Sequence, residues 1–373
     1  MSARFALAAL SSCLLAAACG TSSGLQVENG GSTTRVVKPA GSQPRVDGLD
    51  AVAFPSTSRG WAGGTGAIIA TTDGGSTWTQ QYRGRADIRA LEFADEQHGW
   101  AVASTSLLRT TDGGATWFPA AEPKGLVLTS VTFTSAEQGW GIASPPEARG
   151  GPGLGALVRT ADGGSSWSVV DPHVADSVCV SGGDLIAGAG SKVLDSTDGG
   201  ATWSTLLDAA GDPITQWFTA TVQCPDLQSI WVLYQGGVAA GSEGYAAYTT
   251  ADAGVGWQPV VVAPMLVGSV PAFANVTPLD AYPGPFAAVS ASVAIFLGQC
   301  PACDPQHVTV LRTRNGGARW DRRVVNGFYP TGLAFADSDH GWMTTLVGGV
   351  EGRRSAILAT TDGGRSWHPV YPL

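Results

Sequence analysis

The chain has 373 residues and a formal net charge of −9 at pH 7, and only 14% of its side chains are charged. An acidic chain of this kind does not attract phosphate backbones, which argues against general nucleic-acid binding. Glycine accounts for 51 residues and tryptophan for 13, and no long helical pattern occurs, so the composition predicts an all-β protein rich in turns.

Residues 1–18 have the composition of a signal peptide. Arg4 precedes an apolar run, 5–18, that is too short to span a bilayer as a lasting helix. The run ends in Ala16-Ala17-Ala18-Cys19-Gly20, which resembles the lipobox of bacterial lipoproteins and implies that Cys19 becomes the lipidated first residue. Two alternatives stay open: lipidation at Cys13, and plain secretion after ordinary signal cleavage. All three place the mature protein outside the cytoplasm.

Residues 19–45 are predicted to form a flexible, lipid-anchored tether, because the stretch to about Thr34 is rich in Gly, Ser and Thr. Within it, Arg35–Pro39 is expected to pair with Ser366–Pro372 at the end of the chain as a latch. The remaining residues, 46–373, form the predicted globular domain.

An octapeptide of the form Ser/Thr-x-Asp-Gly-Gly-x-Ser/Thr-Trp recurs along this domain, in seven copies with two drifted members. A short acidic side chain can accept hydrogen bonds from backbone N–H groups two residues on, and the glycines supply the positive φ angles of a two-residue hairpin. Apolar runs flank the copies, so each octapeptide is predicted to join two antiparallel strands, with its Trp as a buried anchor. The acidic or amide residue and the Trp of the copies are Asp73 and Trp78, Asp112 and Trp117, Asp162 and Trp167, Asp198 and Trp203, Asp252 and Trp257, Asn315 and Trp320, and Asp362 and Trp367.

A second pattern, an apolar strand followed by Gly-Trp, precedes the clearest octapeptides, as at Gly60-Trp61 and Gly99-Trp100. Each unit therefore holds four short strands, and seven units without helical linkers predict a single seven-bladed β-propeller. Longer loops are expected at Ser144–Gly155, Gln235–Gly244 and Gln299–Gln306. The sequence does not place the first strand of blade 6 between Val267 and Ser292.

The octapeptide resembles the Asp box, also called the bacterial neuraminidase repeat, of sialidases, sortilin-type receptors and some glucanases. Together with Phe-x-Asp-x-x-x-Gly-Trp it is most similar to the photosystem II stability and assembly factor type of propeller, over residues 46–373. The resemblance implies the fold, and a secreted or lipid-anchored protein without an assigned reaction. It carries no photosynthetic partner with it, because one propeller fold hosts many activities.

No set of side chains predicts catalysis. The repeated acidic residues recur once per blade on separate hairpins, and the five histidines lack metal-ligand spacing. The Arg-Ile-Pro element of sialidases is absent. We therefore expect no catalytic residue, metal or cofactor, although the sequence does not exclude the carboxylate pair that a glycosidase requires.

Four cysteines follow Cys19, an even number that indicates disulfides outside the cytoplasm. Cys179 and Cys224 fall on or near the first strands of neighbouring blades and are candidates for one bridge. Cys300 and Cys303 have the spacing of thioredoxin, but they lie in a loop rather than at the start of a helix that would lower a thiol pKa. A loop-closing disulfide is favoured, with redox chemistry and metal binding as alternatives.

Basic side chains gather in blades 6 and 7 of this acidic chain. They are candidates for binding an acidic partner, although outward-facing, solvated positions on the strands are the favoured interpretation. These residues are Arg312, Arg314, Arg319, Arg322, Arg323, Arg353 and Arg354. Trp217, with Tyr245 and Tyr282, is the candidate stacking group for a sugar.

The sequence thus predicts a non-catalytic, membrane-tethered module that binds an extracytoplasmic protein or assists assembly of an envelope complex. The alternative is a carbohydrate-active enzyme or glycan-binding lectin that uses the axial face. We expect a monomer that contacts the membrane only through its lipid anchor.

Overall fold

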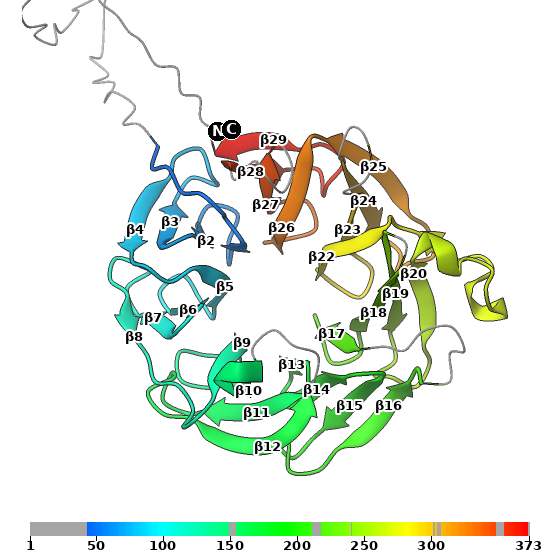
Figure 1. Ribbon diagram of the computed structural model, residues 1–373, viewed down its shortest axis with the longest axis horizontal. Helices are drawn as coiled ribbons and strands as arrows, with labels where there is room; N and C mark the ends of the chain where they lie inside the picture. Colours follow the sequence, from blue (N-terminus) through cyan, green and yellow to red (C-terminus); the bar gives the residue numbers. More distant parts are fainter. Residues whose placement is uncertain are drawn as a thin grey trace, which may run out of the picture. The chain divides into compact units, whose positions relative to one another are not determined.

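The computed structural model describes residues 43–148, 154–210, 218–239, 241–300, 303, 307–347 and 354–371. These residues form seven sheets, each of four antiparallel strands, arranged in a ring (Figure 1). The prediction of a seven-bladed all-β propeller is confirmed. The signal segment, Cys19 and Arg35–Pro39 lie outside the described residues. No helix in the described part is long and apolar enough to cross a membrane.

The strands of each blade follow chain order from the channel to the rim (Figure 1). Blades 1 to 4 contain β1 (Ala51–Ala53), β2 (Gly60–Gly64), β3 (Ala67–Thr71), β4 (Thr79–Arg83); β5 (Ile88–Phe93), β6 (Gly99–Ala103), β7 (Leu107–Thr110), β8 (Phe118–Pro119); β9 (Val127–Phe133), β10 (Gly139–Ser144), β11 (Gly155–Thr160), β12 (Ser168–Ala175); β13 (Ser177–Ser181), β14 (Asp184–Ala189), β15 (Lys192–Ser196) and β16 (Ser204–Asp208). Blades 5 to 7 contain β17 (Thr219–Gln223), β18 (Ile230–Ala239), β19 (Ser242–Thr250), β20 (Gln258–Val262); β22 (Tyr282–Ala288), β23 (Ala294–Gln299), β24 (His307–Thr313), β25 (Asp321–Asn326); β26 (Phe328–Phe335), β27 (Gly341–Val347), β28 (Arg354–Thr360) and β29 (His368–Tyr371). A short strand, β21 (Thr277–Pro278), adds in parallel to β20.

Each octapeptide joins the third and fourth strands of its blade, as predicted, but its hydrogen bonding differs from the expectation. In blade 1 the carboxylate of Asp73 accepts the backbone N–H of Thr77, four residues on rather than two, at 2.8 Å. The hydroxyl of Thr71 accepts the N–H of Gly75 at 2.8 Å, a role that the sequence analysis did not assign. The connection spans residues 72–78 and is therefore no two-residue hairpin.

The glycines of the octapeptide have the predicted positive φ angles, 70° and 102° at Gly74 and Gly75. The drifted copy in blade 5 has Ala253 at the first of these positions, with φ of 58°. A side chain in this left-handed region costs about 1 kcal/mol, so blade 5 keeps the turn at the expense of local strain.

The octapeptide indoles are less buried than predicted. Trp78 is 4% exposed, but the other six are only half-buried. The fully buried indoles belong instead to the second strands, as at Trp61 and Trp100. The reason is position: the octapeptide Trp precedes the outermost strand, whereas the second strand lies between two others.

At three junctions among the described residues, a second-strand indole connects neighbouring blades by stacking on a Phe at or just after the end of the next blade's first strand. The ring centroids of Trp61 and Phe93 are 3.7 Å apart, and those of Trp100 and Phe133 are 3.4 Å apart. Trp342 of blade 7 stacks in the same way on Phe54 of blade 1, at 3.6 Å, and so closes the ring.

The segment before β1 also contacts blade 7. The N–H of Val46 donates to the hydroxyl of Tyr371 at 2.7 Å, and the N–H of Leu49 donates to Ser355 Oγ at 2.8 Å. Both ends of the described domain therefore meet at the same blade.

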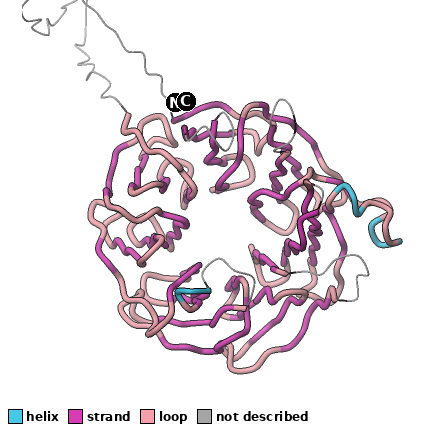
Figure 2. Tube along the Cα trace, viewed as in Figure 1, coloured by secondary structure: helices cyan, strands magenta, loops and turns pink. Residues whose placement is uncertain are grey.

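Blades 5 and 6 differ most from the predicted pattern. The loop expected at Gln235–Gly244 is largely an extension of the β18–β19 hairpin. Between β20 and β22 the chain forms two 3-10 turns, η2 (Pro264–Leu266) and η3 (Pro271–Phe273), on an excursion at the rim (Figure 2). The unplaced first strand of blade 6 is β22. The expected loop Ser144–Gly155 holds a further 3-10 turn, η1 (Pro146–Ala148).

Candidate binding site in the axial channel

The first strands of the blades line a central channel, and a cavity of about 570 Å³ opens where these strands begin. Five blades contribute to it, through Asp50 before β1, Arg89 of β5, Gln223 of β17, Pro283 of β22 and Tyr329 of β26. This volume lies within the range of small-ligand and peptide-side-chain pockets. The other described lining residues are Thr221, Leu233, Gln235, Gly284, Pro285, Phe286, Gln299, Pro330 and Thr331.

Part of the polar lining is already used within the protein. The amide of Gln223 bridges to the inner strand of blade 6, donating to the carbonyl of Phe286 at 2.9 Å and accepting the N–H of Ala288 at 2.7 Å. The amide of Gln235 donates to Glu243 Oε1 at 3.1 Å. These groups hold the wall of the cavity in place.

Two polar groups of the lining have no such partner among the described residues. Gln299 hydrogen-bonds Tyr329, yet its Oε1 is buried without a donor. Arg89 is exposed and has no ion-pair partner in the described part of the chain. Buried polar atoms are nearly always paired in proteins, so the unused acceptor of Gln299 is a candidate contact for a ligand.

The electrostatics of the cavity are mixed. Burial raises the pKa of Asp50, the neighbouring Asp87 raises it further, and Arg89 opposes both. Burial also raises the pKa of the Tyr329 hydroxyl, which therefore stays neutral and able to hydrogen-bond at physiological pH. Asp50 is the one carboxylate among the described residues that line the cavity.

A second cavity of about 360 Å³ lies farther along the channel, where the first strands end. It shares Gln223 and Phe286 with the first cavity, so the two are contiguous. Its acidic residue is Glu92 of β5, whose carboxyl hydrogen-bonds the backbone of Phe133 and the side chain of Thr132 in the next blade. Burial raises the pKa of Glu92 to about 7.

This pKa predicts how the stability depends on pH. The folded protein holds the Glu92 proton up to pH of about 7, whereas the unfolded chain releases it near 4.5, so the stability that protonation contributes is complete below 4.5 and lost as the pH rises through 7. Glu92→Gln keeps the shape without the charge. We expect the variant to be more stable than the parent by roughly 2–3 kcal/mol at pH 8, and to differ little at pH 4.

Urea unfolding of both proteins at the two pH values measures this difference. Glu96→Gln, an exposed carboxylate on the following turn, is the control and should leave both curves unchanged. Equal stabilities of the parent and Glu92→Gln at pH 8 would show that ionisation of Glu92 does not destabilise the folded protein.

The structure separates the arginines that the sequence grouped together. Arg312, Arg314 and Arg319 line a cleft between blades 6 and 7, together with Arg365, which the sequence analysis missed. Arg323 does not line the cleft, but its Nη2 lies 3.3 Å from Oδ1 of Asp321, which does. Arg312 is 3% exposed, so the interpretation that all these arginines are solvated is wrong for it.

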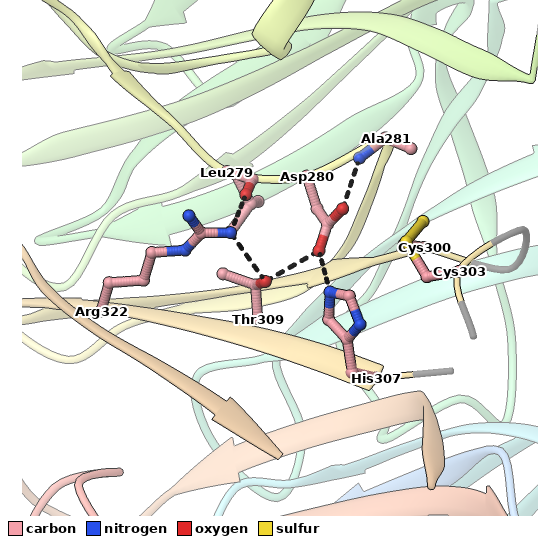
Figure 3. The surroundings of a disulfide bond; sticks show 8 residues. All are labelled: Leu279, Asp280, Ala281, Cys300, Cys303, His307, Thr309 and Arg322. Carbon is pink, nitrogen blue, oxygen red and sulfur yellow. Dashed lines mark hydrogen bonds and ion pairs between the residues drawn. A yellow bond between two sulfur atoms is a disulfide. The ribbon is translucent and has the colours of Figure 1, made fainter. Parts of the chain in front are cut away.

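The other basic candidates lie elsewhere. Arg322 donates to Thr309 Oγ1 at 3.3 Å and to the carbonyl of Leu279 at 3.5 Å, beside the Asp280–His307 pair (Figure 3). Arg354 is exposed near Tyr371. Arg353 and Trp217 lie outside the described residues. None of the described arginine candidates lines the axial cavity.

The aromatic candidates for sugar stacking are corrected by the structure. Tyr245 is fully buried, and its hydroxyl donates to the carbonyl of Asp280 at 2.5 Å, so it cannot stack on a ligand. Tyr282 is half-buried. The residues that do face the axial cavity, Arg89, Gln299 and Tyr329, belong to no motif, and only the blade register could have indicated them.

Two disulfides lie in the described part of the chain. Cys179 of β13 is bonded to Cys224, which follows β17 in the next blade. Cys300 is bonded to Cys303 after β23, near the Asp280–His307 pair (Figure 3). Within the described residues, no group of three or more His, Cys, Asp or Glu side chains could hold a metal ion.

No protein-family model matches the chain, and no curated protein matches it in sequence. Several solved structures share its fold. YCF48 bound to a D1 peptide is 17% identical with a TM-score of 0.57, over 86% of this chain and 95% of that one. An ancestral GH74 enzyme is 14% identical with a TM-score of 0.56, over 88% of this chain and 47% of the enzyme.

A third similar structure is PorZ, an essential bacterial surface component of the type-IX secretion system of Porphyromonas gingivalis. It is 10% identical with a TM-score of 0.54, over 88% of this chain and 38% of PorZ. Similarity at these identities shows the propeller fold alone, because the fold hosts both binding proteins and enzymes.

Proposed function

We propose that this protein is a non-catalytic propeller outside the cytoplasm that binds an extended segment of a partner protein in its axial cavity. The observation that carries the proposal is the buried Gln299 Oε1, which has no donor among the described residues, together with the exposed guanidinium of Arg89 in the same lining. A polypeptide offers N–H groups to the first, and carbonyl or carboxylate oxygens to the second. The D1 peptide bound to YCF48, a propeller of similar fold, supports this ligand class.

The lining favours a peptide over a glycosidase substrate. A retaining or inverting glycosidase needs two carboxylates at a defined separation. Asp50 is the one carboxylate among the described residues of this cavity. Glu92 of the contiguous second cavity is hydrogen-bonded to Phe133 and Thr132 of the next blade. Pro283, Pro285 and Pro330 present apolar rings to the first cavity. Such a surface suits apolar side chains of an extended segment.

The place of action forms part of the proposal. The signal-like residues 1–18, with lipidation of Cys19, would hold the domain at the outer side of a membrane. The two disulfides support an oxidising compartment. A relationship to the Asp-box propellers, through the octapeptide turns, is likewise proposed here.

Selection of short random peptides on the immobilised protein, followed by calorimetry with the enriched peptide, tests this function. Arg89→Gln and Gln299→Leu should each weaken binding by about tenfold, since each removes one polar contact from a desolvated site. Arg83→Gln, on the outer strand β4, is the matched control and should bind as the parent does. Equal affinity of all variants, or release of sugars from a glycan library by the protein, would overturn the proposal.

A further inference from the structure

A second surface lies on the opposite face of the ring, between the octapeptide turns of blades 6 and 7. In blades 2 and 7 a second-strand indole donates to the next octapeptide: Trp100 Nε1 donates to the carbonyl of Gly163, and Trp342 Nε1 to that of Gly74, both at 2.9 Å. Blade 6 has Ile295 at this position, paired with Arg312 as Trp100 is paired with Arg109. An isoleucine cannot donate a hydrogen bond to the octapeptide of blade 7.

Arg312 lies against that octapeptide instead. A Cβ on Gly363 would be 2.9 Å from Arg312 Nη2 and 3.0 Å from Nε. The guanidinium therefore fits against this turn because residue 363 is a glycine. Arg109 packs on Gly163 in the same manner, but its Nη1 also donates to the carbonyl of Asp162 at 3.3 Å.

The guanidinium of Arg312 is unsatisfied. It is 3% exposed, and its Nε and Nη2 have no acceptor among the described residues. A buried cation with free donors is costly unless an anion compensates it. This observation indicates a ligand independently of the number of arginines nearby.

The cleft that Arg312 lines has a volume of about 390 Å³ and a positive charge. Its lining holds four arginines and one aspartate, a net charge of +3, in a chain whose total is −9. Arg314 is paired with Asp339, and Arg365 Nε lies 3.5 Å from Asp321. Arg319 has no ion-pair partner in the described part of the chain.

A further donor is available in the lining. Trp320, the octapeptide indole of blade 6, borders the cleft, and its buried Nε1 has no acceptor among the described residues. Guanidinium groups and an indole N–H together offer several hydrogen-bond donors. An anion with several oxygen acceptors satisfies them better than a single carbonyl does.

We propose that this cleft is a binding site for a phosphate group, either free phosphate or the headgroup of an anionic phospholipid. The phosphate would accept hydrogen bonds from Arg312 and Arg319 and neutralise the excess charge of the cleft. The site is separate from the axial cavity. The third strand of each blade runs parallel to the first, so the octapeptide that follows it lies at the end of the ring where the first strands end. The axial cavity of about 570 Å³ opens at the other end, where the first strands begin.

Calorimetry with inorganic phosphate, and flotation with phosphatidylglycerol and phosphatidylcholine vesicles, test the proposal. The full chain carrying Cys19→Ser is used, so that a lipid anchor does not bind every vesicle. We expect inorganic phosphate or phosphatidylglycerol vesicles to bind, and acetate and phosphatidylcholine not to. Binding of inorganic phosphate alone would identify free phosphate as the ligand. Binding of the anionic vesicles alone would identify the phospholipid headgroup.

Two variants make the test specific. Arg319→Ala changes an exposed residue that the fold does not need, and should weaken binding by about tenfold. Arg312→Met should abolish binding, whereas Arg109→Met, in the same register of blade 2, should retain it. Absence of binding to both probes, or binding unchanged in Arg319→Ala, would overturn the proposal even if Arg312→Met failed to fold.

Discussion

Replacing Trp342 with alanine is expected to lower the free energy of unfolding by roughly 3–5 kcal/mol, the largest effect of a single substitution that we predict. The indole is 3% exposed, stacks on Phe54 at 3.6 Å and donates to the carbonyl of Gly74 at 2.9 Å. Its removal leaves a cavity and an unpaired carbonyl at the junction where the last blade meets the first. Chemical denaturation measures the loss.

Matched variants separate ring closure from simple burial. Trp100→Ala removes an indole with the same contacts between blades 2 and 3, and should cost a similar amount. Only Trp342→Ala should also increase hydrogen exchange in residues 43–54, because these pack on blade 7. Trp342→Phe should recover most of the stacking but not the hydrogen bond. A parent-like unfolding midpoint for Trp342→Ala would contradict the assigned role.

Blade number and blade order could be predicted because the determinants are local. Asp73, its glycines and Trp78 form one turn from consecutive residues, and the same turn recurs at a readable spacing. The first strand of blade 6 could not be placed from the sequence, because Pro283 and Pro285 interrupt the strand pattern of β22. These prolines are tolerated because β22 is an edge strand that faces the channel, where missing N–H donors are not needed by a neighbour.

The axial cavity could not be predicted in the same way. Its lining comes from five blades, and each blade contributes single residues such as Arg89 or Gln299 that carry no motif. Sequence spacing shows which residues share a blade, but not which of them face the axis at one level. The arginines show the same limitation: the sequence pattern could not distinguish the buried Arg312 of β24 from the exposed Arg314 that follows the strand.

The junction of blades 4 and 5 lacks the aromatic pair that joins blade 1 to blade 2, blade 2 to blade 3 and blade 7 to blade 1. Ile186 stands at the Trp position of blade 4, and Cys224 stands at the Phe position of blade 5. The Cys179–Cys224 disulfide connects the two blades there, so a covalent bond takes over the role that stacking has at Trp61 and Phe93.

The double variant Cys179→Ala/Cys224→Ala is therefore expected to lose about 4 kcal/mol of stability, the loop-entropy value for a bridge across a sequence separation of 45. Cys300→Ala/Cys303→Ala is the control, because its bridge spans a separation of 3 and should contribute less than about 2 kcal/mol. Denaturation of the parent and both variants without reductant gives the comparison. Since Cys179 and Cys224 also pack on the core around Ile186, the first variant should lose stability even relative to the reduced parent. Equal losses in the two double variants would mean that the inter-blade bridge adds nothing beyond local loop closure.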